Sequence, residues 1–204
     1  MKLTIDNFKS MMNLSLANVK AREEEFSKLD AIAGDGDHGT AIVTALTIIA
    51  GDAQQGTEFP AMLNDMGMGV MMKTSTLLGA LFMGMGEALE PLGVTDELNA
   101  AQVKVMFRGG LTGVEEQTKA KLGDKTMMDA LVPAVVAIES CDSEDVKELL
   151  KAGAEAALKG AEATVNMKAN FGRARNLGER SVGFADAGAT SWACLFESFY
   201  QGLE

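Results

Sequence analysis

Residues 29–40 read LDAIAGDGDHGT, and they interrupt a sequence that is otherwise typical of α-helices. Ala, Leu, Met and Glu dominate the chain, and Pro occurs only three times. Alternating runs of Val, Ile, Thr and aromatic residues, which would indicate strands, are missing from the sequence. We therefore expect an all-α protein in which this glycine- and aspartate-rich segment is a loop between two helices.

Apolar spacing and helix-terminal residues place the helices on either side of this loop. Pro60 suits the first turn of a helix, Thr95 suits a cap, and Pro133 is expected to kink the helix that contains it. The expected helices cover about residues 5–29, 40–49, 60–72, 77–89 and 95–116, followed by helices that begin near residues 126, 143 and 187.

The seventh expected helix, which starts at Ser143, has a single apolar face. This face consists of Val146, Leu149, Leu150, Ala154, Ala157, Leu158, Ala161 and Val165.

With short loops between helices, neighbours are expected to run antiparallel. We expect residues 1–204 to form one domain, an antiparallel barrel or bundle of about eight helices.

Composition excludes several classes of protein. The net charge of −11 repels nucleic acid and anionic lipid, so neither is an expected partner. Cys141 and Cys194 have no CxxC spacing, which argues against a disulfide framework and a zinc site. The N-terminus lacks the apolar region of a signal peptide, and no uncharged apolar run is long enough to span a membrane. We expect a cytoplasmic protein whose fourteen methionines fill an irregular core.

The loop at residues 29–40 carries three carboxylates, Asp30, Asp35 and Asp37. Carboxylates this close repel one another unless a cation lies between them, and oxygen ligands suit Mg²⁺. The spacing differs from that of an EF-hand, which also needs a Glu at the twelfth loop position. Asp-Gly pairs are equally common in ordinary turns, so the pattern alone leaves a metal site and a plain turn both open.

Two further loops break the helical pattern. Residues 122–127, LGDKTM, end at a helix N-terminus, which attracts phosphate but is also an ordinary capped helix start. Residues 171–190 read FGRARNLGERSVGFADAGAT and are too long for a simple connection. The guanidinium groups of this segment match phosphate oxygens, although Arg173 could pair with surface acids instead. Carboxylates, arginines and two helix N-termini together describe a nucleotide-phosphate site, without a Walker A, Rossmann or protein-kinase motif.

In order and spacing, the three loops resemble the L subunit of dihydroxyacetone kinases, the ATP-binding half of these enzymes. The segments that carry the likeness are LDAIAGDGDHG (29–39), GDKTMMDALVPAV (123–135) and GRARNLGERSVGFADAGATS (172–191). The resemblance implies an eight-helix barrel that holds ADP or ATP at one rim through two Mg²⁺ ions. It implies that the metal ligands are Asp30, Asp35 and Asp37, that Arg173 binds phosphate and is catalytic, and that the other nucleotide-binding residues are His38, Gly39, Thr40, Thr76, Thr126, Met127, Asp186, Ala187 and Gly188.

Residues 72–80, MKTSTLLGA, depart from the family pattern. Relatives place a Gly-Gly-x-Ser-Gly-like loop here against the phosphates, whereas this chain keeps only Gly79 and has Leu78 in the Ser position. Ser75 or Thr76 then supplies the hydroxyl, and Lys73 adds charge. Ala187 likewise replaces a common Pro.

The resemblance also implies a divided enzyme. Relatives hold the ketose covalently on a histidine of a separate K subunit, and the only histidine here, His38, lies in the carboxylate loop. Some L subunits exchange ATP at each turnover, whereas others keep ADP bound and are rephosphorylated by a phosphotransferase-system M subunit, which we favour for this chain. The alternatives are a kinase subunit for another short ketose or a fatty acid, and a non-catalytic nucleotide-binding regulatory protein.

Overall fold

The computed structural model describes residues 1–203, and they form an all-α structure, as the sequence predicts. The only strands in this range, β1 (Leu3–Thr4) and β2 (Glu97–Leu98), form one short antiparallel pair. The helices are α1 (Ile5–Ala21), α2 (Glu23–Ala31), α3 (His38–Gln55), α4 (Phe59–Lys73), α5 (Thr76–Leu89), α6 (Ala100–Gln117), α7 (Met128–Ser140), α8 (Val146–Ala163) and α9 (Ala187–Gln201), with 3₁₀ turns η1 (Glu90–Leu92), η2 (Thr164–Asn166) and η3 (Arg173–Ser181).

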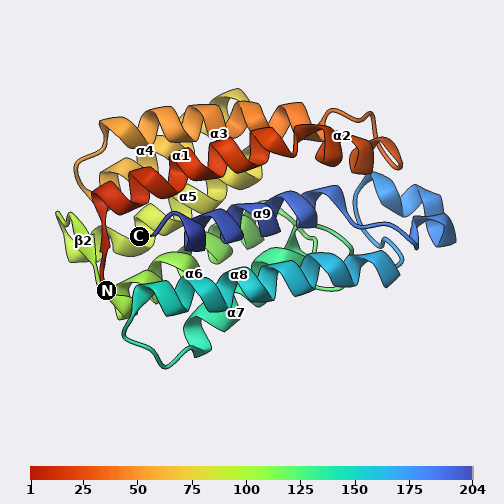
Figure 1. Cartoon of the computed structure of the whole chain (residues 1–204). Helices are drawn as coiled ribbons and strands as arrows, with labels where there is room; N and C mark the ends of the chain where they lie inside the picture. The colour runs from red at the N-terminus through yellow and green to blue at the C-terminus, as the bar shows by residue number, and fades with distance from the viewer. Residues whose placement is uncertain (204) are drawn as a thin grey trace.

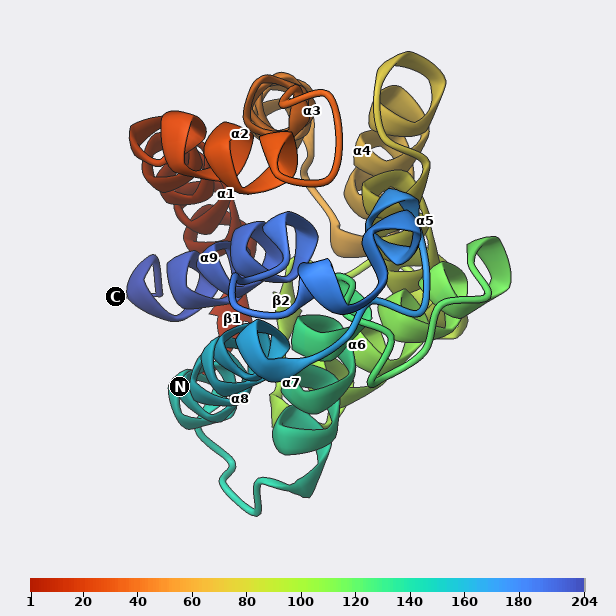
Figure 2. The same ribbon diagram turned by 90° about the vertical axis from the view of Figure 1, so that its right-hand side faces the viewer.

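The long helices close into a ring. Each of α3 to α8 packs against the next one in the chain, α9 packs against α1, and α1 packs against α3, so the circle is complete (Figure 2). The short helix α2 lies across α3 and α9 at one end of the ring. Figure 1 shows both chain termini at the opposite end, so the loop after α2 and the segment before α9 share a rim free of termini.

The expected first helix is two helices, which corrects the single span of residues 5–29. Arg22 separates α1 from α2 with φ −109° and ψ 11°, outside the helical range. Its guanidinium donates two hydrogen bonds of 2.8 Å to the Glu25 carboxylate and lies 5.1 Å from the centre of the Phe26 ring. Phe26 is completely buried. The break at Arg22 thus coincides with the burial of Phe26 in the first turn of α2.

Two predicted helix starts were wrong because a different side chain supplies the cap. The hydroxyl of Thr95 donates to the Glu97 carbonyl, while Asn99 and Gln102 form a full capping box at the start of α6. At α8 the cap is Asp145, whose carboxylate accepts from Lys147 N–H at 3.0 Å, and not Ser143. The helix expected at residues 40–49 runs instead from 38 to 55, because Ala50 and Ala53 continue its buried face.

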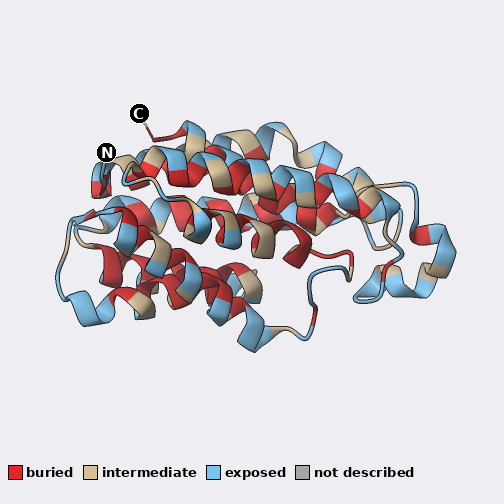
Figure 3. Cartoon of the chain, turned by 90° about the horizontal axis from the view of Figure 1, so that it is seen from below, coloured by how far each residue is buried: buried red, intermediate tan, exposed pale blue. Residues whose placement is uncertain are grey.

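The buried faces of the helices point into the ring (Figure 3). The predicted apolar face of α8 is buried from Val146 to Ala161 with one exception, Leu158, which is 51% exposed. Phe107, Phe196 and Phe199 pack ring against ring between α6 and α9, with centroids 5.7 to 6.1 Å apart. Half of the fourteen methionines are completely or almost completely buried, as expected for residues that fill an irregular core: Met11, Met12, Met62, Met66, Met85, Met106 and Met128.

Within residues 1–203, none of the helices combines the length and the apolar character needed to cross a bilayer.

Candidate functional site

The loop between α2 and α3 wraps around Asp30, which lies in the last turn of α2. One oxygen of its carboxylate accepts a hydrogen bond of 2.9 Å from Gly36 N–H. Gly36 has φ +77°, and a Cβ on Gly34 would lie 2.8 Å from the other Asp30 oxygen. Both glycines are therefore required by the turn, since a side chain at either position would open the loop away from Asp30.

The turn brings Asp30, Asp35 and Asp37 together. Each offers a carboxylate oxygen, and these oxygens all lie within 4.8 Å of one another. The Arg173 guanidinium, 2.6 Å from Asp35, lowers the pKa of that carboxyl. A hydrogen bond with Asp35, and after it the negative charge of that carboxylate, raise the pKa of Asp37. Three converging oxygen donors with mutual repulsion have the chemistry that a hard divalent cation requires.

His38 begins α3 and connects the carboxylate loop to α9. Its Nε2 lies 2.8 Å from Ser191 Oγ, and that hydroxyl donates at 3.0 Å to the Gly188 carbonyl. The Ser191 hydroxyl can accept from Nε2–H while it donates to Gly188, or donate to an unprotonated Nε2. Burial lowers the pKa of His38, which favours the neutral ring. The imidazole is thus held by Ser191 beside the N-terminus of α9.

Gly39 and Thr40 serve the packing of α3 on α2. Gly39 is buried, and a Cβ there would lie 3.0 Å from the Glu23 carbonyl carbon. Thr40 is exposed and its hydroxyl donates to the Glu23 carboxylate at 2.9 Å. Neither residue lines the cavities described below, so a role for them in nucleotide binding stays a prediction.

Only one half of the capping box predicted for Thr126 and Asp129 is present, the bond from Thr126 N–H to Asp129, and α7 begins at Met128 rather than near 126. The completely buried carboxylate of Asp129 accepts from Thr126 N–H at 2.8 Å and from Gly123 N–H at 2.6 Å. The Thr126 hydroxyl accepts from Met128 N–H at 3.2 Å. Asp129 thereby holds the loop before α7 in a tight curve, and this curve brings Thr126 to the rim.

The third segment ends at Asp186, which caps α9. Its carboxylate accepts from Ala189 N–H at 2.7 Å, and its own N–H donates to the Thr164 hydroxyl at 2.9 Å. Loss of hydration raises the pKa of Asp186 to about 6, with a further contribution from the negative charge of Asp129. Asp186 is the predicted start of α9, and the structure confirms that start.

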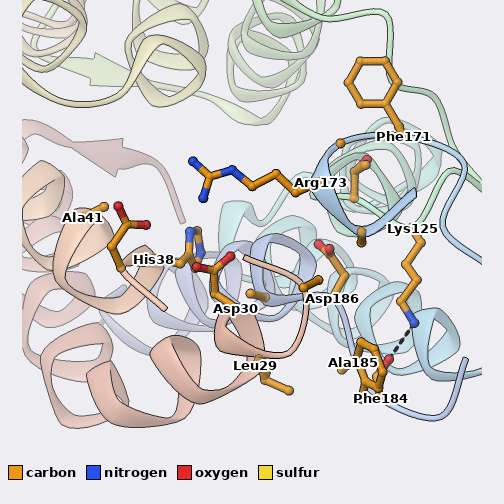
Figure 4. A pocket seen from close by; sticks show the side chains of 16 residues that line it. Leu29, Asp30, His38, Ala41, Lys125, Phe171, Arg173, Phe184, Ala185 and Asp186 are labelled. Atoms are coloured by element: carbon orange, nitrogen blue, oxygen red, sulfur yellow. Dashed lines mark hydrogen bonds between the residues drawn. The ribbon is translucent and has the colours of Figure 1, made fainter. Parts of the chain in front are cut away.

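These segments enclose a cavity of about 240 Å³ (Figure 4). Asp30 and His38 lie on one side and Asp186 and Lys125 on the other, while the Arg173 side chain extends across the opening. The cavity therefore joins the carboxylate cluster to two cationic side chains and to the N-terminus of α9. Its polar lining consists of Asp30, Asp37, His38, Lys125, Thr126, Arg173 and Asp186.

A second cavity of about 230 Å³ adjoins the first, because His38 and Ala41 line both. Its wall is mainly apolar, with Thr74 and Ser75 as hydroxyl-bearing exceptions. The predicted residues Met127 and Gly188 lie here and not in the first cavity. The remaining lining residues are Ile42, Ala45, Leu77, Leu78 and Trp192.

The atypical segment 72–80 forms the start of α5 beside this second cavity. The Ser75 hydroxyl caps the helix by accepting from Leu78 N–H at 3.3 Å. Leu78 is buried, whereas Thr76 and Lys73 are exposed and line neither cavity. Of the two hydroxyls considered from the sequence, Ser75 is therefore the one that faces the site.

Sequence reasoning missed Lys125 and Trp192 as lining residues. Lys125 is 2% exposed and has φ +60°, a backbone conformation that residues other than glycine rarely adopt. A lysine between Asp124 and Thr126 gave no signal of burial, and a lone Trp inside an apolar helix is typical of a core residue.

Comparison with known proteins identifies the family. The model of the DAK2 domain matches residues 32–201, which is most of the chain. The chain belongs to the DAK2 domain family. It is 35% identical over 182 residues to the ADP-binding subunit DhaL of the PEP-dependent dihydroxyacetone kinase of Escherichia coli, and the match covers 82% of each protein. A DhaL subunit of Listeria innocua is 32% identical, over 90% of this chain and 89% of the relative.

Other DAK2 relatives are much longer. The D-erythrulose kinase of Mycolicibacterium smegmatis is 35% identical over 84% of this chain, but the chain spans only 31% of that enzyme. The crystal structure of the C. freundii dihydroxyacetone kinase with AMP-PNP and Mg²⁺ matches 95% of the chain with a TM-score of 0.73. This chain covers 33% of that structure at 24% identity, so the match establishes the shared all-α fold.

Proposed function

We propose that this DAK2 domain is the nucleotide- and magnesium-binding subunit of a dihydroxyacetone kinase that acts together with a separate K subunit. The observation that carries the proposal is the single cavity in which Asp30 and Asp37 of the carboxylate cluster, Arg173 and the N-terminus of α9 converge. The names of the E. coli and L. innocua relatives, ADP-binding subunits of similar length, support the same role.

Asp30, Asp35 and Asp37 are the residues that would hold magnesium, as two ions if this chain follows its resemblance. Their oxygens converge, and the pKa of Asp37 is raised by its hydrogen bond with Asp35 and by the negative charge of that carboxylate, which a bound cation would neutralise. Bound Mg²⁺ supplies positive charge that neutralises phosphate oxygens during phosphoryl transfer. The short loop, fixed by the Gly36 to Asp30 hydrogen bond, orients the carboxylates before the cation arrives.

The two adjoining cavities suit the two parts of a nucleotide. The first offers Arg173 and the N-terminal N–H groups of α9, beginning at Ala187, which favour phosphate. The second has an apolar wall that includes Met127 and Trp192 and so suits a base. Arg173 is the residue expected to neutralise charge on the transferred group, and His38 and Ser191 orient the edge shared by both cavities.

A separate protein must present the acceptor hydroxyl. His38 is the only imidazole of the chain, and it is bound to Ser191 rather than free to hold a carbonyl substrate. The K subunit of the family is the expected carrier of a short ketose, and a phosphotransferase-system M subunit is the expected phosphoryl donor. E. coli and L. innocua relatives are named PEP-dependent, which favours this donor over exchange of free ATP.

One observation favours the alternative, a non-catalytic nucleotide-binding regulator. The Leu78 N–H that opens α5 is already bound by the Ser75 hydroxyl, so phosphate must displace this cap to use it. A protein that binds ADP and Mg²⁺ but does not support transfer with any K subunit would have this function.

Calorimetric titration of the purified chain tests the proposal. ADP is expected to bind in the presence of Mg²⁺ and to lose most of its affinity when EDTA removes the cation. Equal affinity with and without EDTA, or no binding of ADP, would contradict it.

A further inference from the structure

Lys125 is a buried cation that lies between α6 and α7. No carboxylate oxygen of residues 1–203 lies within 4 Å of its ammonium. Burial lowers the pKa of this amine, and the negative charge of Asp186 acts in the opposite direction. Burial of a lysine without an ion pair is costly, and its backbone φ of +60° is rare outside glycine, so the position points to a specific task.

The ammonium is satisfied by backbone carbonyls instead. It donates to Phe184 O at 2.7 Å, to Met167 O at 3.3 Å and to Ser181 O, and it lies 4.7 Å from the centre of the Phe184 ring. Three protons meet three acceptors, so the donor capacity of the group is filled. Figure 4 shows the Lys125 side chain pointing away from the cavity toward Phe184.

All three carbonyls belong to the two ends of one segment. Residues 167–184 leave η2 and return beside it, and Arg173 lies in the middle of this excursion. Other contacts also close the segment: Ala169 N–H donates to Ser181 Oγ at 2.8 Å, Gly183 N–H donates to Val165 O at 2.8 Å, and the Lys168 ammonium pairs with the Glu179 carboxylate at 2.8 Å. From outside the segment, the loop before α7 accepts Asn170 N–H on Asp124 O at 3.2 Å, and the Lys125 side chain binds carbonyls at both ends of the segment.

We propose that Lys125 is the positioning residue for Arg173: it fixes the base of segment 167–184, and through it the reach of the guanidinium across the cavity. The inference rests on the proposed function, in which Arg173 binds phosphate. Arg173 itself is 65% exposed, and its ion pair with Asp35 joins two exposed side chains, so the pair alone holds it weakly. Its placement therefore depends on the backbone that carries it, to which Lys125 contributes three hydrogen bonds.

Lys125→Met tests the inference, because it keeps the length of the side chain and removes the three donors. Lys121→Met is the matched control, since Lys121 belongs to the same loop and is exposed. In the nucleotide-free protein, Lys125→Met is expected to speed amide hydrogen exchange in residues 167–184, and Lys121→Met is not. ADP affinity in Mg²⁺ is expected to fall by about tenfold or more in Lys125→Met and by less than about twofold in the control.

A double-mutant cycle with Arg173→Ala separates positioning from a general loss of stability. If Lys125 acts through Arg173, Lys125→Met adds less than about threefold to the loss already caused by Arg173→Ala. Losses that multiply, or unchanged affinity in Lys125→Met, would overturn the inference. Should Lys125→Met not fold, the cycle is run with Lys125→Arg, which keeps the charge and donors and is expected to show a smaller loss.

The experiment keeps the two hypotheses apart. If the parent protein does not bind ADP, the proposed function fails, and hydrogen exchange still reports whether Lys125 holds the segment. If the parent binds ADP and segment 167–184 exchanges equally fast in both proteins, the positioning role of Lys125 is wrong.

Discussion

Arg173 Nη1 lies 2.6 Å from Asp35 Oδ2, so the arginine segment and the carboxylate loop meet across the mouth of the cavity. Both side chains are more than half exposed. Exposed ion pairs contribute little stability, so Arg173 can exchange this partner for a phosphate oxygen at small cost. In the proposed function Asp35 is a cation ligand and Arg173 is a phosphate ligand, and the two side chains lie within hydrogen-bonding distance of each other.

Removal of one charge from the cluster is expected to abolish Mg²⁺-dependent ADP binding. Asp35→Asn and Asp37→Asn each delete a ligand oxygen charge, while relief of carboxylate repulsion should leave thermal stability without Mg²⁺ at or above that of the parent. Asp142→Asn, an exposed acid between α7 and α8, is the control. Calorimetry with ADP and Mg²⁺ provides the measurement, and unchanged affinity in both cluster variants would exclude a metal site there.

Arg173→Lys is expected to weaken ADP binding by about ten- to a hundredfold, because an ammonium cannot reproduce the two-pronged geometry of a guanidinium. Arg175→Lys is the matched control, since Arg175 is exposed in the same 3₁₀ turn. The affinities of both variants are compared by titration at one salt concentration. If Arg173→Lys binds as tightly as Arg175→Lys, Arg173 is a surface residue that pairs only with Asp35.

Asp186 makes the stability of the protein depend on pH. Its pKa is about 6 in the folded protein against an ordinary value of 3.8, so the folded state binds the proton more tightly than the unfolded state. The stability that Asp186 contributes is therefore fully present below about pH 4 and is lost as the pH rises to about 6. Asn also caps helices but does not titrate.

Asp186→Asn is accordingly expected to gain stability relative to the parent between pH 4 and 7, by up to about 3 kcal/mol. Denaturant unfolding without nucleotide at several pH values measures the difference. Asp142→Asn should run parallel to the parent over the same range. A constant offset between Asp186→Asn and the parent would mean that the carboxyl titrates normally.

Ser75→Ala is expected to destabilise the protein by about 1 kcal/mol, the usual cost of a lost N-terminal cap. Thr76→Ala, at the next position with an exposed side chain, should stay within about 0.5 kcal/mol of the parent. Chemical denaturation compares the two. Equal effects would show that the Ser75 hydroxyl does not cap α5.

The apolar periodicity of the helices and the residues at their ends predicted most of the fold, because both depend on residues that are close in the sequence. α5 and α9 begin within one residue of their predicted starts, and Asp186 caps α9 as expected. The break at Arg22 was not predicted, because the residues on both sides favour helix. It accompanies the burial of Phe26 against the rest of the fold. Tertiary packing decided this element, and periodicity does not report it.

At the candidate site, too, local sequence patterns were predictable and contacts between distant segments were not. Asp30, Asp35, Asp37 and Arg173, which the structure brings together, were candidates from the sequence because clustered charges in glycine-rich loops are unusual. Lys125 was missed, because its role depends on carbonyls of a segment about fifty residues away that no local pattern places beside it.

Phosphoryl transfer by the isolated chain tests the central claim most directly. The purified chain is incubated with Mg²⁺-ATP and dihydroxyacetone or erythrulose, alone and with a K subunit, and the product is followed by mass spectrometry. A second arm supplies an M subunit and a phosphohistidine donor in place of ATP. The account predicts no product from the chain alone and product only when the K subunit is present, because the chain has a nucleotide site and no residue free to hold the ketose. Sustained turnover by the chain without any partner would contradict it and would place the substrate site within this ring of helices.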